Sequence, residues 1–115
     1  MDALENLDVW KRSCRLSVDL YAALCACKDF GFRDQITRSA LSVPSNIAEG
    51  YERDSAKEFS RFLKIAKGSC GELRTQLYIG AEVGFVDKAK AFQMIQEAVE
   101  ISRMLQGLIR RCKAR

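Results

Sequence analysis

The segment from Arg38 to Gly50 constrains the fold most, because it lies in a stretch that carries two helical stripes at once. Apolar residues recur at spacings of four, three and four, the period of one helix face: Ile36, Ala40, Val43 and Ile47. Small or polar residues form a second line beside them: Ser39, Ser42, Asn46 and Glu49. Solvent-facing lines of a helix are usually charged. The second line therefore predicts close contact with another helix.

Pro44 interrupts this segment. Proline cannot donate a backbone hydrogen bond, so it kinks or ends a helix. The apolar period continues in phase across Pro44, which favours one kinked helix over residues 34–52. The alternative is a break at Val43-Pro44, with Asn46 as the cap of a new helix and Glu49 as its capping-box partner.

Capping residues and apolar periodicity predict four helices in a single domain over residues 1–115, at about 7–28, 34–52, 55–83 and 87–111. Asn6 or Asp8 is expected to cap the first helix, Ser55 the third and Asp87 the fourth. Residues 29–33 are expected to form a loop, because Gly31 is typical of a helix end. Short connections predict an all-α, antiparallel up-down-up-down four-helix bundle.

The third predicted helix contains a patch of small residues, Gly68 to Gly71. Each glycine costs about 1 kcal/mol relative to alanine inside a helix, which is acceptable where another backbone comes close. We expect the polar line of the second helix to lie there. The predicted interface, within one subunit or between two, comprises Ser39, Ser42, Asn46, Glu49, Ser69 and Glu72. Tyr21 is expected on the apolar seam of the first helix, and Phe92 on that of the fourth.

Catalytic and metal chemistry find little support in the sequence. The chain has no histidine, which is the usual general base and metal ligand. Glu49 and Glu72 could form an acid–base pair, but interhelical hydrogen bonding explains both residues. The spacing of Cys25 and Cys27 is not that of a zinc site. We therefore predict a protein that is not an enzyme and has no cofactor and no metal.

The N-terminal sequence and the cysteines predict a location. The sequence begins with acidic residues and no apolar run, and no window is long and apolar enough for a membrane span. Five cysteines are an odd number, and most occupy apolar helix positions, which is typical of free thiols in a reducing compartment. We expect a cytoplasmic protein without membrane contact.

Basic residues form two clusters in a chain of net charge +4. Lys57, Arg61 and Lys64 lie within about 60° on one helix face. The C-terminal cluster consists of Arg110, Arg111, Lys113 and Arg115. These clusters predict contact with nucleic-acid phosphates, and the alternative is an ordinary solvated face.

The sequence RSALSVPSNIAEGYERDSAKEFSRFLKIAKGSCGELRTQLYIGAEVGF resembles the signature of a bacterial four-helix-bundle family, the 23S rRNA intervening-sequence proteins. The stretch ENLDVWKRSCRLSVDLYAAL resembles the first helix of that family, so the resemblance covers residues 5 to about 86. It implies a homo-oligomer, specifically a pentamer, associated with RNA. The related accessory protein of diversity-generating retroelements binds nucleic acid and a reverse transcriptase, which implies similar partners here. The expected function is therefore a non-catalytic, RNA-associated oligomer, and the alternative is a structural or protein-interaction scaffold.

Overall fold

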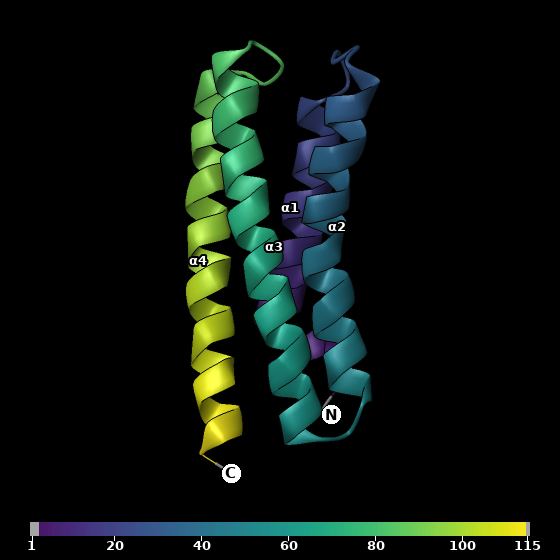
Figure 1. Ribbon diagram of the computed structural model, residues 1–115, viewed down its shortest axis with the longest axis vertical. Coiled ribbons are helices and arrows are strands. Elements are labelled where there is room, and N and C mark those ends of the chain that lie inside the picture. Colours follow the sequence, from purple (N-terminus) through teal and green to yellow (C-terminus); the bar gives the residue numbers. More distant parts are fainter. Residues whose placement is uncertain (1–2, 115) are drawn as a thin grey trace.

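The computed structural model describes residues 3–114 as a bundle of four long α-helices (Figure 1). They are α1 (Asp8–Ala23), α2 (Phe30–Glu52), α3 (Ala56–Glu82) and α4 (Lys88–Lys113), and the short 3-10 helix η1 (Leu4–Asn6) precedes α1. No strand occurs in residues 3–114, so the predicted all-α class is confirmed. The helices lie along an axis of 45 Å, and their connections are at alternate ends in Figure 1.

Helix α2 runs without interruption through Pro44, so the alternative of a break at that position is wrong. The helix keeps its apolar phase there, because Val43 and Ile47 are buried on either side of the proline. The bend expected at Pro44 stays a prediction.

The connection between α1 and α2 differs from the sequence prediction. Helix α1 ends at Ala23 instead of residue 28, and α2 begins at Phe30 instead of residue 34. The Asp29 carboxylate accepts a hydrogen bond of 3.0 Å from the backbone N–H of Phe32, which makes Asp29 the N-cap of α2. The predicted loop over residues 29–33 is therefore a cap and the first helical turn. Gly31 lies inside that turn and does not end a helix.

The other helix starts show which capping signals were sufficient. Helix α1 follows Leu7, whose side chain makes no capping hydrogen bond, so the prediction of Asn6 or Asp8 as the cap is wrong. Ser55 Oγ accepts from the N–H of Glu58, and the Asp87 carboxylate accepts from the N–H of Lys90. These two caps of α3 and α4 are confirmed.

All four helices contribute to one apolar core, and its largest fully buried side chains include Leu20, Ile36, Ile47, Leu63, Leu77, Ile101 and Leu105. Removing this apolar surface from water supplies the main favourable free energy of folding. The prediction that Phe92 lies on the apolar seam of the fourth helix is wrong, because 62% of its surface is exposed and Ala91 takes the inward position at that level of α4. Tyr21 is likewise exposed on α1.

Gly50 and Gly80 are the glycines whose missing side chain leaves room for an aromatic residue of a neighbouring helix. A methyl group on Gly50 would lie 2.7 Å from Cβ of Phe62, and one on Gly80 would lie 2.7 Å from the ring of Phe32. Gly68 and Gly71 are exposed, and a methyl group on either would have no neighbour within 4 Å. The expectation that α2 packs on these two glycines is therefore wrong.

These environments predict opposite effects of the same substitution. We expect Gly50→Ala to lower the free energy of unfolding by about 1–3 kcal/mol, because the added methyl group overlaps Phe62. Gly68→Ala should raise it by up to about 1 kcal/mol, because alanine favours the helix and the space is open. Urea denaturation of both variants measures the two values. A Gly50→Ala variant as stable as Gly68→Ala would contradict this packing.

Candidate functional site

A hydrogen-bonded polar seam joins α2 to α3 within one chain. Ser42 Oγ and Ser69 Oγ share a hydrogen bond of 2.8 Å. Asn46 Nδ2 donates to Ser42 Oγ at 2.9 Å and to the Ser42 carbonyl oxygen at 2.8 Å. Since Ser42 Oγ accepts from Asn46, its own proton is available for Ser69. Short side chains thus connect the two helices where the sequence places its polar line.

The other predicted interface residues do not join this seam. Ser39 is buried, and its Oγ donates to the Gln35 carbonyl within α2. Glu49 is exposed and accepts a hydrogen bond of 3.0 Å from Arg53, the residue that follows α2. Glu72 is exposed on α3. In the described residues, no hydrogen bond or ion pair brings Glu49 and Glu72 together.

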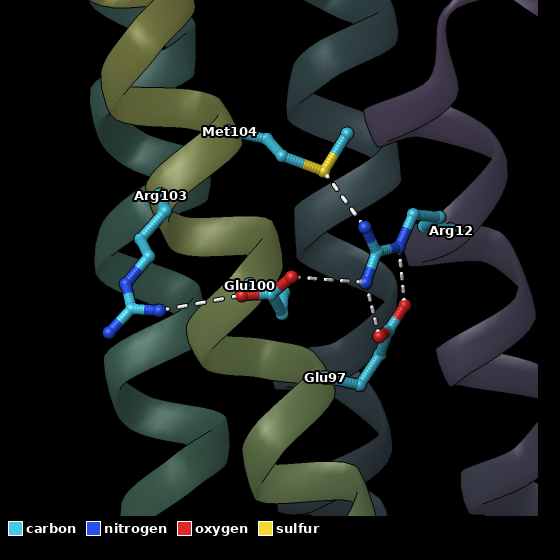
Figure 2. A network of polar contacts seen from close by, with 5 residues as sticks. All are labelled: Arg12, Glu97, Glu100, Arg103 and Met104. Atoms are coloured by element: carbon cyan, nitrogen blue, oxygen red, sulfur yellow. Dashed lines mark hydrogen bonds and ion pairs between the residues drawn. The ribbon is translucent and has the colours of Figure 1, made fainter.

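A second polar network, between α1 and α4, was missed from the sequence (Figure 2). Arg12 Nε donates to Glu97 Oε2 at 2.8 Å, and Arg12 Nη2 donates to Glu97 Oε1 at 2.5 Å. Arg12 Nη1 lies 3.4 Å from the sulfur of Met104, and Nη2 lies 4.0 Å from a carboxylate oxygen of Glu100. The two-pronged geometry fixes the rotation of α4 against α1. No local sequence pattern connects residues 85 positions apart.

The Arg12–Glu97 bridge separates two cavities in the groove between α1 and α4. One, of about 290 Å³, is lined by Leu16 and Met94 among others, and the second, of about 400 Å³, by Leu7 and Leu108 among others. The hydrogen bonds from Arg12 lower the pKa of Glu97, although partial burial opposes that shift. The bridge therefore stays charged at neutral pH.

The lowered pKa of Glu97 predicts a pH-dependent stability. In the unfolded chain Glu97 binds protons more readily, so the bridge stabilises the fold above the ordinary pKa and loses its effect as pH falls through the lowered pKa. We expect Glu97→Gln to reduce the free energy of unfolding by up to about 1 kcal/mol at neutral pH, because the pair is part-exposed.

Urea denaturation from neutral to acidic pH measures this difference. The gap between Glu97→Gln and the unmodified protein should narrow as pH falls, and Glu100→Gln should show a smaller effect because its carboxylate lies farther from Arg12. A gap that stays constant across the acidic range would contradict the assignment.

The predicted basic residues that lie in the described range are all exposed: Lys57, Arg61, Lys64, Arg110, Arg111 and Lys113. Arg115 lies outside the described residues. Arg61 makes two hydrogen bonds of 3.1 Å to Glu58 and lies 4.3 Å from the centre of the Phe62 ring. Arg111 lines the second cavity between α1 and α4, away from α3. Arg61 is therefore held by neighbouring side chains and Arg111 faces the groove between α1 and α4, which separates both from the other four cations.

The two basic clusters lie at the same end of the bundle, because α3 and α4 are neighbours joined by residues 83–87. Lys67 Nζ donates to Gln106 Oε1 at 2.7 Å, so these two residues lie side by side in the register of the two helices. Residues before Lys67 on α3 consequently lie beside residues after Gln106 on α4. In Figure 1 the start of α3 and the end of α4 are both at the lower end.

We define the basic face as the cations that this register brings to the outer side of α3 and α4: Lys57, Lys64, Lys67, Arg110 and Lys113. Helical periodicity places Lys67 on the side of α3 that faces α4, with Lys64 about 60° farther around the helix and Lys57 on its outward side. Arg110 and Lys113 lie on the side of α4 that faces α3. Glu58 is the sole acidic residue in 57–67, and residues 101–114 contain none. None of the five cations forms an ion pair with an acidic residue in the described range.

Arg103 borders the basic face, but it is paired with Glu100 at 3.4 Å (Figure 2). Lys67 was not among the predicted site residues, although its spacing from Lys64 places it on the next line of the helix. Its role depends on the Gln106 contact, which joins residues 39 positions apart.

These features define the protein as a small all-α bundle with polar contacts between its helices and a basic face. Within residues 3–114, no group of three or more His, Cys, Asp or Glu residues could hold a metal ion. None of the helices in that range is both long and apolar enough to cross a bilayer.

Comparison with known protein families assigns the chain to one of them. The model of the 23S rRNA-intervening sequence protein family matches residues 5–107, and the chain belongs to this family. A crystal structure of a protein of unknown function from the S23 ribosomal protein family of Bacteroides thetaiotaomicron is similar, with a TM-score of 0.81 and 25% identity. The match covers 88% of this chain and 97% of that one. No curated protein matches the sequence.

Proposed function

We propose that the protein is a non-catalytic, RNA-associated bundle that binds phosphates through its basic face. The observation that carries this proposal is the gathering of five cations from two helices on one surface, none of which forms an ion pair in the described residues. Such a surface attracts a polyanion. RNA is favoured because the family to which the chain belongs is named for an intervening sequence of 23S rRNA.

The chemistry of the basic face predicts binding without base recognition. Four of its five cations are lysines, which contact phosphates as point charges instead of reading base edges. Each neutralised phosphate releases counterions, so the affinity should fall steeply with salt. Five contacts correspond to a slope of about −4 to −5 in a plot of log affinity against log salt concentration.

The proposal includes a homo-oligomer, for which the resemblance to the family implies a pentamer. Large apolar side chains are exposed on α3 and at its C-terminal end, namely Ile65, Tyr78, Ile79 and Val83, and a second copy would cover them. A ring would also repeat the basic face around its axis. Light scattering tests this part: about five times the 13.0 kDa of one chain supports it, and the mass of a single chain contradicts it. A reverse transcriptase as partner is proposed from the resemblance alone.

The same exposed apolar side chains favour a second candidate, a protein-interaction scaffold without nucleic-acid binding. The two candidates differ in salt dependence, because only the RNA-associated protein should bind structured RNA at low salt and release it as salt rises.

Charge reversal on the basic face tests the proposed function. We expect Lys57→Glu combined with Lys64→Glu to weaken binding of structured RNA at least about tenfold, because two attractions become repulsions. Fluorescence anisotropy at low salt measures the affinity, and circular dichroism should show unchanged helix content because both residues are exposed.

The matched control is Lys28→Glu combined with Lys88→Glu, which changes the net charge equally at the other end of the bundle, where α1 is followed by α2 and α4 begins. This control should retain most of the binding. If both double variants weaken binding alike, only net charge matters and the basic face is not the site.

A further inference from the structure

The basic end of the bundle offers no exposed aromatic ring on which a base could stack. Its aromatic side chains are half-buried or buried: Trp10, Tyr51, Phe59 and Phe62. Phe62 is covered by the guanidinium groups of Arg61 and Arg53, which lie 4.3 and 5.1 Å from its ring centre. Among the described residues, the exposed aromatic side chains are Tyr21, Phe30, Tyr78 and Phe92. All four lie near the opposite end, where α1 and α3 end and α2 and α4 begin (Figure 1).

This separation matters because single-stranded nucleic acids are usually held by aromatic stacking together with backbone charge. Unpaired bases that approach the basic face meet lysine and arginine side chains, the exposed aliphatic side chain of Ile65 and small residues such as Gly68 and Gly71, but no exposed aromatic ring. At the basic end of the bundle, only the phosphate backbone is then available for strong contact.

The cations of the basic face lie in two rows, one on each helix. Lys57 and Lys64 are seven residues apart on α3, a rise of about 10 Å. The second row, Arg110 and Lys113, is on α4, and packed helices lie about 8–10 Å apart. A duplex presents two phosphate strands along each groove, whereas a single strand presents one. Two rows of cations therefore suit a duplex better than a single strand.

Charge density favours the duplex further. Each phosphate contact contributes about −0.9 to the salt slope for a duplex and about −0.7 for a single strand, because the duplex condenses more counterions. When all contacts go to phosphates, the more densely charged ligand binds more tightly.

We propose, resting on the proposed function, that the ligand of the basic face is base-paired RNA, bound through its backbone without regard to sequence. Lys67 is held between the rows by Gln106, so it contributes charge at a fixed position, while Lys57 and Lys64 are exposed side chains that can follow the phosphates.

The test compares two labelled RNAs by fluorescence anisotropy over a series of salt concentrations. One is a duplex of about 20 base pairs, and the other is an unstructured single strand with the same number of phosphates. We expect the duplex to bind at least about tenfold more tightly at low salt, with a slope of about −4.5 against about −3.5 for the single strand. A duplex of scrambled sequence should bind with the same affinity.

The remaining outcomes separate this inference from the proposed function. A single strand that binds as tightly as the duplex, or more tightly, overturns the duplex preference and leaves RNA association standing. Loss of affinity on scrambling the duplex overturns backbone recognition. Absence of binding to either RNA at low salt overturns the proposed function itself.

Matched variants locate the duplex site. Lys57→Gln combined with Lys64→Gln should reduce the duplex slope by about 2, while Lys28→Gln combined with Lys88→Gln should leave it unchanged. Equal slopes for the two variants would overturn the assignment to the basic face.

Discussion

The register of α3 between α2 and α4 is the constraint on which the rest of the structure depends. Apolar burial drives the helices together, but it is non-directional and does not by itself fix their positions along their axes. Close packing such as that of Gly50 on Phe62 does so, together with two hydrogen bonds two residues apart on α3: Ser69 bonds to Ser42 of α2, and Lys67 bonds to Gln106 of α4. Helix α3 thus contacts α2 through the short side chain of Ser69 and α4 through the long side chain of Lys67. The basic face exists because this register places the start of α3 beside the end of α4.

The cations of the chain divide by what they contact, and this division decides which of them a ligand can use. Arg12 and Arg61 each donate hydrogen bonds to a carboxylate, so their charges are neutralised within the bundle. Lys57 and Lys64 are exposed and form no ion pair in the described residues. Like charges gathered in this way repel one another and favour the arrival of a polyanion. Counting basic residues in the sequence does not separate these two groups.

Local signals predicted the fold well, because they act within a few residues of the chain. Ser55 and Asp87 cap helices through bonds to residues three positions on, and the apolar phase across Pro44 predicted a helix that does not break. Asp29 follows the same capping rule, but the nearby Gly31 is a competing signal that is typical of a helix end.

Features that depend on contacts between helices were not predictable from the sequence. The Arg12–Glu97 bridge joins distant positions, and Phe92 has an apolar side chain at a position that the neighbouring helices leave exposed. Gly68 and Gly50 look alike in sequence, yet only Gly50 meets another helix. The sequence predicts the two basic clusters separately. That they lie side by side follows only from the register of α3 and α4 in the structure.

The central claim is that RNA contacts the basic face, and lysine footprinting tests it most directly. The protein is acetylated with and without base-paired RNA, and each modified lysine is quantified by mass spectrometry. The account predicts that RNA protects Lys57, Lys64 and Lys113, while Lys28 and Lys88 at the other end react as before. Equal protection at both ends, or protection confined to Lys28 and Lys88, would contradict it.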